Sequence, residues 1–476
     1  MGNPVGRLRT LANFGGNLRW RARCYRPRND DDVLKFLEKH RAERIRAIGS
    51  LHSWSDIAQG TGWTLDMSEF ADVRPYGNKV QVGAGCTLDK LLESLDRLAG
   101  RTLPTMGVIK RQTISGIIST GTHGSGRPSL SHFVTAVRIA AYDAEGQPKI
   151  YDRLAGEELK AVRCALGCMG ILLSIELATV PKYRVRETIR QLPGVQEALG
   201  LYALHPLTQF ALVPHAWKVV AWERHGMPPG DSGARPIRAW LFRVFNLLGI
   251  DIAFHALLWV CVRLGPSAAR ALMKAMPSTL KLVTGIPRVD DAERVLTLKH
   301  HLFRHEEMEM FVRESRIAEA AGLLRCAIEI AAGDIPEPPA AIGRALREAG
   351  LFEDLMRLRG SYVHHYPMLF RRVEPDDTLI SMSGSSDEAW FSFSLFTYHP
   401  PRRRQRFHEL CSWCARAMNA LFGARLHWGK HYPAALDVQA TTRVHAGLPA
   451  FNALRRALDP HGVFRNDFTD RVLGSE

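Results

Sequence analysis

The chain has 476 residues, of which 46% are hydrophobic, so it is long enough for two or three domains with apolar cores of their own. This composition excludes an intrinsically disordered chain and a small module held together by disulfides. The formal net charge is +15 at pH 7, which raises the question of a phosphate-bearing partner such as nucleic acid or an anionic membrane.

The amino-terminal residues 1–16 contain Arg7 and Arg9 but lack the apolar stretch of a signal peptide. We therefore expect a cytoplasmic protein in a reducing compartment, where thiols stay unpaired. We expect all eight cysteines to be free: Cys24, Cys86, Cys164, Cys168, Cys261, Cys326, Cys411 and Cys414.

Short elements broken by glycine-bearing turns make up the first part of the chain. Apolar residues at helical spacing predict a helix over residues 31–40, and an alternating pattern predicts a strand over residues 44–48. A second predicted strand over residues 79–82 runs into the Gly-Ala-Gly of residues 83–85, and leucines at helical spacing predict a helix over residues 88–98. This succession is an α+β pattern.

Three stretches rich in Gly, Ser and Thr stand out among the loops, at residues 48–56, 114–126 and 165–171. The first is suited to wrapping a diphosphate with backbone and hydroxyl donors, because small residues let the backbone approach a ligand closely. Each stretch taken alone could instead be a tight structural turn. Their occurrence together, in this order, is more specific than any one of them.

The middle of the chain, residues 185–421, has longer helical stretches and one unusually apolar segment, Trp240–Leu264. Asp251 falls in the middle of this segment, whereas a bilayer span needs about 20 nearly uncharged residues, so we do not expect the segment to cross a membrane. An interfacial helix anchored by Trp and Arg stays open. A buried or partner-covered helix pair is the default interpretation.

Several common motifs are absent or incomplete. No G-x-x-x-x-G-K-[ST] sequence occurs, and residues 83–85 lack the third glycine of a dinucleotide fingerprint. The single C-x-x-C, Cys411–Cys414, lies in a helical pattern without a second pair, and His301 and His305 lack the glutamate of H-E-x-x-H, so we expect no metal site. The densest basic cluster, residues 402–406, follows two prolines that open a helix and has no interleaved aromatic residues, so we expect no nucleic-acid partner.

Four motifs in order carry a resemblance to a known family. They are H-S-x-S-D-I-A at His52–Ala58, S-T-G-T-H-G-S-G at Ser119–Gly126, L-G-x-x-G-I at Leu166–Ile171 and H-W-G-K at His427–Lys430. With them, over nearly its whole length, the chain resembles the FAD-linked oxidoreductases of the vanillyl-alcohol-oxidase superfamily, which have a PCMH-type FAD-binding domain. Within that superfamily it is similar to the group of sugar-acid lactone and alditol oxidases, which includes the gulonolactone and arabinonolactone oxidases.

The resemblance implies an α+β fold in two parts. A two-subdomain FAD-binding domain is expected over residues 1–183, and about residues 425–476 complete it. A substrate-binding cap domain with an antiparallel sheet is expected over residues 184–424, with an apolar helical insertion near residues 236–284.

The resemblance also implies FAD as the cofactor, with residues 48–53 holding its diphosphate. His52 matches the histidine that many members link covalently to the flavin, and a hydrogen bond to a noncovalent flavin is the alternative. The residues implied to bind the cofactor are Ile48, Gly49, Ser50, Leu51, His52, Ser53, Ser115, Gly116, Ser119, Thr120, Gly121, Thr122, His123, Gly167, Gly170, Ile171 and Lys430.

The implied reaction is hydride transfer from a carbinol carbon to flavin N5, while a base takes the hydroxyl proton. Lys430 matches the lysine of H-W-G-K and is expected on a strand-like run, with its ammonium near the flavin and the substrate hydroxyl. Arg371 takes the arginine position of the E-x-R pair that relatives carry on a strand, but Leu369 stands where their glutamate would be. This departure leaves the substrate-side base and the substrate class open.

Two further candidate catalytic residues have structural alternatives. Glu307 aligns near a polar substrate-binding position and can restore a carboxylate, unless residues 306–312 form an alternating edge strand with solvated acids. Thr113 falls near a serine that contacts substrate in relatives, and a simple strand hydroxyl is the alternative.

We therefore expect an FAD-dependent oxidoreductase, similar to D-arabinono-1,4-lactone oxidase, that oxidises a hydroxyl of a small sugar-derived substrate, an aldonolactone or alditol. Oxygen, a quinone or a cytochrome would reoxidise the flavin. Two alternatives stay open: a membrane-associated dehydrogenase of a lipid-linked sugar, with peripheral contact through residues 240–264, and a flavin-fold scaffold without turnover.

Overall fold

The computed structural model describes residues 6–228, 240, 243–280, 284–298, 303–384 and 387–475. Its first sheet has four strands in the order β1 (Arg7–Ala12), β2 (Arg19–Tyr25), β4 (Trp63–Asp66) and β3 (Ile45–Ile48). The two inner pairings, β2 with β4 and β3 with β4, are parallel, and helix α1 (Asp30–Lys39) connects β2 to β3. The cap for α1 is the side chain of Asn29, which accepts from the backbone N–H of Asp32.

A second, antiparallel sheet follows in the order β5 (Val73–Tyr76), β6 (Lys79–Gly83), β10 (Ile171–Ala178), β8 (Val134–Tyr142) and β9 (Pro148–Leu154). Its apolar side chains share one core with helix α2 (Leu88–Ala99), whose leucines at helical spacing point inward. The remaining elements of this part are η1 (Asp56–Ala58), β7 (Arg101–Thr102), α3 (Ile114–Ser119), η2 (Leu130–Phe133), α4 (Gly156–Val162) and β11 (Val180–Pro181).

The rest of the chain is built on a large antiparallel sheet. Its strands run in the order β15 (Arg288–Asp291), β12 (Arg184–Leu192), β14 (Lys218–Met227), β13 (Gln209–Val213), β17 (Met368–Val373), β18 (Trp390–Thr397), β16 (Glu306–Arg313) and β19 (Arg425–Leu426). Because side chains alternate along a strand, each strand sends every second residue to one face. Phe210, Phe370 and Phe393 stack on one face, in the same core as helix α10, whereas Leu369 and Arg371 point to the other.

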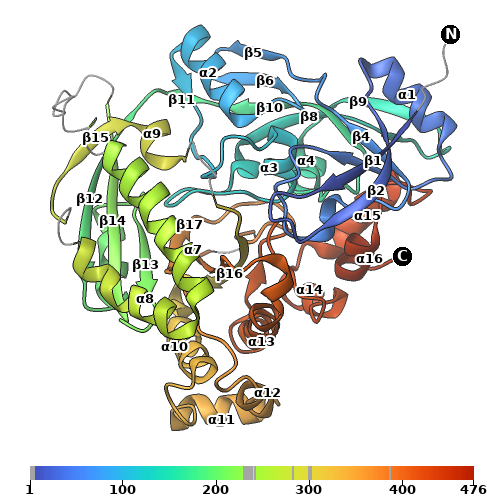
Figure 1. Cartoon of the computed structure of the whole chain (residues 1–476). Helices are drawn as coiled ribbons and strands as arrows, with labels where there is room; N and C mark the ends of the chain where they lie inside the picture. Colours follow the sequence, from blue (N-terminus) through green and yellow to red (C-terminus); the bar gives the residue numbers. More distant parts are fainter. Residues whose placement is uncertain are drawn as a thin grey trace.

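Helices surround this sheet unevenly. Around the phenylalanine face and the sheet ends lie α5 (Val195–Leu199), η3 (Gly200–Ala203), α9 (Ala292–Leu296), η5 (Glu314–Arg316), α10 (Ile317–Ala332), α11 (Ala340–Glu348), α12 (Phe352–Arg357), η6 (Pro401–Arg403) and α13 (Gln405–Phe422). In Figure 1, helices α7 (His255–Leu264) and α8 (Pro266–Leu280) lie across the other face, beside β13 and β14. The π-helical segment η4 (Asn246–Phe254) leads into α7.

The helical insertion is buried on one side only. Leu258, Val262 and Met273 pack against Val213 and Val220 of the sheet. One helix of the described chain, Arg243–Leu264, is long and apolar enough to cross a membrane by length and composition, and 7% of its most apolar stretch is buried. Several large apolar side chains of the insertion are therefore exposed: Trp240, Leu248, Ile252, Leu257, Trp259, Val260 and Leu264.

The end of the chain returns to its beginning. Of the helices drawn red in Figure 1, α15 (Leu448–Leu458) packs on α4 and β8, α16 (Asp467–Leu473) packs on η1, and α14 (Val438–Val444) packs on α16. The backbone N–H of Ile45 donates to the carbonyl of Val463 at 2.9 Å, and the Asn466 amide donates to the carbonyl of Ile57 at 3.1 Å. The residue limits given above for the two domains stay a prediction.

The local expectations are largely confirmed, with two corrections. The helices expected over 31–40 and 88–98 and the strands over 44–48 and 79–82 are α1, α2, β3 and β6, the C-x-x-C lies in α13, and all eight thiols are free. The strand-like run expected at Lys430 is wrong, because β19 ends at Leu426 and Lys430 lies in the turn that follows. The edge-strand alternative for residues 306–312 is also wrong, because β16 lies between β18 and β19 and its acids are buried. His301 lies outside the described residues.

Candidate active site

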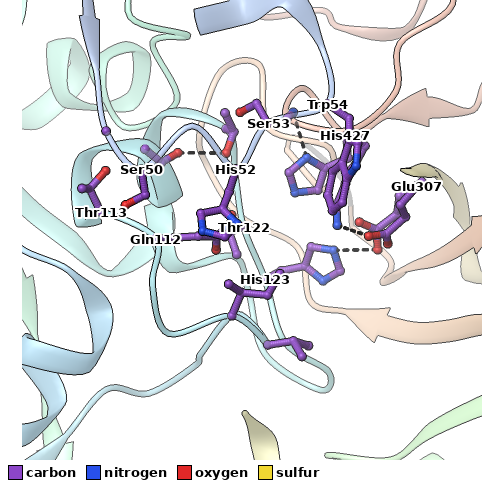
Figure 2. A pocket seen from close by; sticks show the side chains of 18 of the residues that line it. Ser50, His52, Ser53, Trp54, Gln112, Thr113, Thr122, His123, Glu307 and His427 are labelled. Carbon is purple, nitrogen blue, oxygen red and sulfur yellow. Dashed lines mark hydrogen bonds and ion pairs between the residues drawn. The ribbon is translucent and has the colours of Figure 1, made fainter. Parts of the chain in front are cut away.

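A cavity of about 670 Å³ lies where the loops of the amino-terminal part meet the open face of the large sheet. Figure 2 shows His52 and Thr122 on one side of this cavity and Trp54, His427 and Glu307 on the other. All four candidate catalytic residues and most of the residues implied to bind FAD line it. Two do not: Ile171 is buried in a separate core cluster, and Gly121 faces the side chain of Met382.

The loop after β3 is shaped for a ligand that approaches its backbone. Leu51 adopts a positive φ of 56°, which turns successive backbone groups toward the cavity. A Cβ atom on Gly49 would come within 1.9 Å of Thr113 Oγ1, so only glycine fits there. The Thr113 hydroxyl is buried and has no hydrogen-bond partner among the described residues, although a buried polar group normally has one. These features fit a bound FAD.

The loop over residues 165–171 forms another part of the wall. Leu166 and Gly167 both have positive φ, 52° and 69°. The buried guanidinium of Arg46 donates to their carbonyl groups at 2.8 and 2.9 Å and to that of Phe464 at 2.8 Å. Burial lowers the pKa of Arg46 to about 10, which leaves it charged at neutral pH. Arg46 also donates to the carbonyl of Ile57, so all four of its Nη–H groups are used and the side chain fixes the cavity wall from behind.

His52 and Trp54 bring the first loop toward the large sheet. The His52 ring stacks on Phe14 with 5.2 Å between centroids and 25° between planes. The Trp54 indole N–H donates to the carbonyl of His305 at 2.8 Å, just before β16 begins. The loop that carries His52 is thereby fixed to the strand that carries Glu307.

Lys430 and Glu307 form an ion pair at the cavity wall. The Lys430 ammonium donates to Glu307 Oε2 and lies 4.7 Å from the centre of the Trp54 ring. The backbone holds the pair together as well, because the N–H of His431 donates to the carbonyl of Glu307 at 2.8 Å. Since both side chains are mostly buried, 17% and 6% exposed, this pair is far less screened than a surface ion pair.

A second buried pair lies two residues along β16. His123 Nδ1 donates to the carbonyl of Gly124 at 2.8 Å, and His123 Nε2 lies 3.2 Å from Glu309 Oε1. Burial raises the pKa of Glu309, but His123, Lys430 and His427 outweigh burial and hold it well below its ordinary value. Glu309 is therefore a carboxylate that faces the ring of His123.

Arg371 and His427 complete this group. Arg371 Nη1 lies 3.8 Å from Glu309 Oε1, so the carboxylate missing at Leu369 is supplied from the neighbouring part of the sheet. Burial lowers the pKa of His427 to about 3, and its Nδ1 accepts from the backbone N–H of Gly429 at 3.0 Å. His427 is thus neutral, with its proton on Nε2.

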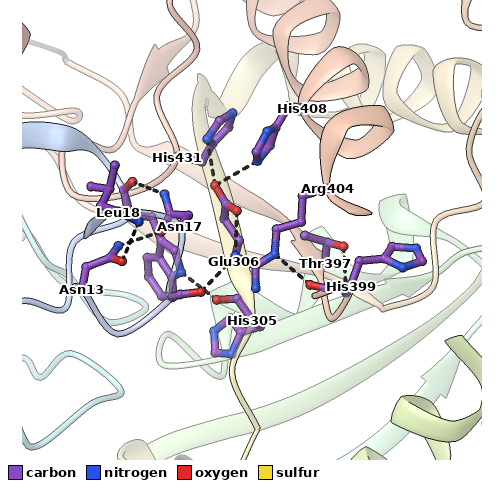
Figure 3. A network of polar contacts seen from close by, with 12 residues as sticks. Asn13, Asn17, Leu18, His305, Glu306, Thr397, His399, Arg404, His408 and His431 are labelled. Atoms are coloured by element: carbon purple, nitrogen blue, oxygen red, sulfur yellow. Dashed lines mark hydrogen bonds and ion pairs between the residues drawn. The ribbon is translucent and has the colours of Figure 1, made fainter. Parts of the chain in front are cut away.

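The residue before Glu307 belongs to a separate network on the opposite side of β16. Figure 3 shows Glu306 between Arg404 on one side and His408 and His431 on the other. Arg404 donates to Glu306 Oε2 at 2.9 Å, while the two imidazoles lie 3.1 and 3.0 Å from Oε1 and stack on each other. This network fixes the start of β16 and leaves Glu307 facing the cavity.

Comparison with known proteins identifies the family. The family model "D-arabinono-1,4-lactone oxidase" matches residues 175–472, more than half of the chain, and the model "FAD binding domain" matches residues 22–147. The chain belongs to the D-arabinono-1,4-lactone oxidase family. It is an FAD-dependent oxidoreductase, so the cofactor and enzyme class predicted from the sequence are confirmed.

The relatives of this member of the lactone oxidase family are named for different substrates. A long-chain alcohol oxidase from an uncultured marine euryarchaeote is 38% identical over 98% of this chain and 97% of its own. An L-gulono-1,4-lactone dehydrogenase from Mycobacterium tuberculosis is 26% identical over 93% of each chain. Among solved structures, cholesterol oxidase from B. sterolicum is 15% identical with a TM-score of 0.74, over 98% of this chain and 97% of that one, which shows the shared fold.

Sequence reasoning missed three residues of the site. Glu309 follows Glu307 at the spacing of two that puts strand residues on one face, and this signal was available. Arg46 alternates with Ile45 and Ala47 on a predicted strand and gave no signal, because its partners are carbonyls from distant segments. Gln112 lines the cavity next to Thr113 without belonging to a motif.

Proposed function

We propose that this member of the D-arabinono-1,4-lactone oxidase family oxidises a carbinol of its substrate to a carbonyl, with the hydroxyl held between Lys430 and Glu307. The observation that carries the proposal is this buried ion pair at the wall of the cavity that fits FAD. The Glu307 carboxylate is an acceptor for the hydroxyl proton, and the Lys430 ammonium donates to the hydroxyl oxygen as negative charge develops there. When bound, FAD accepts the hydride.

The other residues of the site hold the reacting groups in place. The loop of residues 48–53 binds the diphosphate, Arg46 fixes the cavity wall behind it, and the Thr113 hydroxyl donates to the cofactor. The contact between His123 and Glu309 holds the Glu309 carboxylate beside Arg371, and neutral His427 adds an N–H donor without adding charge. Preorganised donors of this kind act strongly because these side chains are buried.

For the substrate, we propose a sugar-derived hydroxy compound, an aldonolactone or an alditol. Gln209, Arg224 and Arg371 line the cavity and offer donors to the further hydroxyls or the lactone carbonyl of such a molecule. The name of the mycobacterial relative, an L-gulono-1,4-lactone dehydrogenase, supports this class. A long-chain alcohol is the second candidate. Leu369 in the glutamate position favours it, as does the name of the 38% identical relative.

We propose that His52 is bonded covalently to the flavin ring. Its imidazole lines the cavity and is held by stacking on Phe14, which fixes the ring for a single attack geometry. A yellow fluorescent band on a denaturing gel would support the bond, and the variant His52→Ala should lose the band while it keeps FAD by noncovalent contacts. Release of all flavin from the wild-type protein by acid precipitation would contradict the bond.

We further propose a cytoplasmic enzyme that binds peripherally to a membrane through residues 240–264. The exposed apolar side chains of this segment and the net charge of +15 support binding to an anionic surface. Sedimentation with phosphatidylglycerol vesicles, reversed by salt, tests it. The acceptor is proposed to be oxygen or a membrane quinone. Peroxide release in air and reduction of a soluble quinone distinguish the two.

The reaction itself is tested by anaerobic bleaching of the flavin spectrum. The holoenzyme is mixed with a panel of lactones, alditols and alcohols, and oxygen is then readmitted. Bleaching by a hydroxy compound, with formation of the matching carbonyl product, is the expected result. A flavin that no member of the panel reduces would instead favour a scaffold without turnover.

A further inference from the structure

The sheet face that lines the cavity is divided into a polar and an apolar half. The polar half contains Glu187, Arg224 and Arg371. Arg224 Nε donates a hydrogen bond to Glu187 Oε2 at 2.6 Å. Leu369 and Trp222 lie in the other half, in one cluster with the buried sheet residues and the helical insertion. A fully hydroxylated substrate needs polar partners around its whole surface. In the apolar half, Leu369 and the ring faces of Trp222 present mostly hydrocarbon, so this half is suited to a different part of a ligand.

Leu369 places this apolar half directly beside the reacting groups. In the register of the sheet it lies opposite Ser394, which in turn lies opposite Glu309. A glutamate here would face the same space as Arg371, two residues along β17. With leucine, the wall next to the His123–Glu309 and Lys430–Glu307 pairs is hydrocarbon.

The apolar half continues from Leu369 to the helical insertion. Phe396 at the end of β18 and Tyr398 just after it are 6% and 7% exposed. Both line the cavity together with Leu247 of the segment η4. A group of aromatic residues, called the portal here, closes this end: His255, Phe303, Tyr366 and Tyr398. His255 Nε2 lies 3.0 Å from the Tyr398 hydroxyl and 3.3 Å from that of Tyr366, and its ring is parallel to Phe303.

The helix that carries His255 faces the cavity with one side and the surroundings with the other. Its outer side exposes Leu257, Trp259, Val260 and Leu264, between 43% and 75% exposed. Arg263 lies 3.3 Å above the Trp259 ring, a cation and an aromatic side chain placed together as at a lipid headgroup boundary.

Charge complementarity identifies the partner of this outer side. Helices α7 and α8 contain no Asp or Glu, and their exposed cations are Arg263 and Lys274, whereas Arg270 is paired with Asp334. Exposed apolar side chains next to these two cations fit an anionic lipid bilayer, whose hydrocarbon contacts the apolar side chains and whose phosphates contact Arg263 and Lys274. The portal would then open next to the lipid phase.

We infer that the enzyme also oxidises long-chain primary alcohols, which it takes from the bilayer through the portal, with the chain lying along Leu369 and Trp222 and the hydroxyl between Lys430 and Glu307. This inference rests on the proposed function. The alcohol R–CH₂–OH becomes the aldehyde R–CHO: one hydride passes from carbon to the bound flavin and the hydroxyl proton to Glu307. The two electrons then leave with the acceptor, oxygen or a quinone.

The first test varies the chain length on the holoenzyme. Linear primary alcohols from butanol to hexadecanol are assayed beside L-gulono-1,4-lactone and an alditol, both by anaerobic flavin bleaching and by turnover. We expect kcat/KM to rise about fourfold for each added methylene group until the apolar half is filled, which corresponds to the burial of one CH₂ group. Bleaching by lactone or alditol without any trend in chain length would overturn the inference and leave the proposed function intact. Failure of every compound would remove both.

The second test changes the wall. The variant Leu369→Glu should lower kcat/KM for dodecanol at least tenfold, because the carboxylate would be buried against hydrocarbon, and should raise the ratio of lactone to dodecanol activity. Leu98→Glu, on the exposed side of α2, is the matched control for the same substitution. Flavin content and melting temperature establish that the variants fold. An unchanged ratio in Leu369→Glu would overturn the placement of the chain.

The third test concerns delivery from lipid. Hexadecanol is presented in phosphatidylglycerol vesicles and butanol in water. The double variant Trp259→Ser and Leu264→Ser should lower the ratio of hexadecanol to butanol activity at least tenfold. The control is Leu204→Ser, which replaces an exposed leucine outside the helical insertion and should leave that ratio unchanged. Equal ratios in the double variant and the wild type would overturn entry from the bilayer.

Discussion

Replacing Lys430 by Met separates the two consequences of a buried ion pair. Lys430 donates to Glu307, whose side chain is only 6% exposed, so the variant leaves a buried carboxylate without its cation. Loss of one positioned donor to the reacting oxygen costs about 2.7 to 4 kcal/mol of transition-state stabilisation, a fall in kcat of about a hundredfold to a thousandfold. Leaving the carboxylate unpaired costs about 3 to 5 kcal/mol of folding stability.

A double variant distinguishes catalysis from stability. In Lys430→Met with Glu307→Gln, the stranded charge is gone, so we expect much of the lost stability to return while kcat stays low. Chemical denaturation gives the stability, and the rate of anaerobic flavin reduction gives the chemistry. Lys79→Met is the matched control, because Lys79 pairs with Glu176 at 2.8 Å on another sheet, and Glu176 keeps Arg153 as its cation when the lysine is replaced. Wild-type flavin reduction in Lys430→Met would refute the role of this lysine.

Two further predictions concern pH and cofactor binding. Burial lowers the pKa of His364 and His427 to about 3. An unfolded histidine has a pKa near 6.5, so between about pH 6.5 and about pH 3 both histidines bind a proton only when the protein unfolds. The free energy of unfolding therefore decreases as the pH is lowered through this window, by up to about 1.4 kcal/mol per histidine and pH unit. Equal denaturation midpoints at about pH 7 and about pH 5 would contradict this. Gly49→Ala should weaken FAD binding about tenfold or more, since its Cβ would overlap Thr113 Oγ1, as measured by FAD titration. Gly322→Ala, whose Cβ meets no heavy atom within 4 Å, is the control and should bind FAD normally.

The sequence predicts the cofactor loops well because their signals are local. A run of small residues after a predicted strand leads to the loop of residues 48–53, and the structure places that loop on the cavity wall. The conformation depends on short-range backbone geometry, such as the positive φ of Leu51 and the absence of a side chain at Gly49. In the folded chain, residues of all three loops line the same cavity.

The catalytic sheet is less predictable because its signals are long-range. Alternation along residues 306–312 is compatible with an exposed edge strand, and only the pairing with β18 and the return of β19 bury the acids. The partner of Arg371 is likewise decided by register. The E-x-R pair of the resembling family pointed to position 369, whereas the carboxylate comes from Glu309, two strands away.

The register of β16 links the stability of the fold to the chemistry of the site. Glu306 and Glu307 are neighbours and therefore point to opposite faces, one into the Arg404, His408 and His431 network and the other toward Lys430. A slip of one residue would move Glu307 out of the cavity and bury Glu306 against Trp54 and Lys430. Such a slip would break three polar contacts to Glu306 at once, so the network behind the strand opposes it. His431 belongs to that network and directly follows Lys430, so the same contacts also fix the turn from which the lysine reaches the cavity.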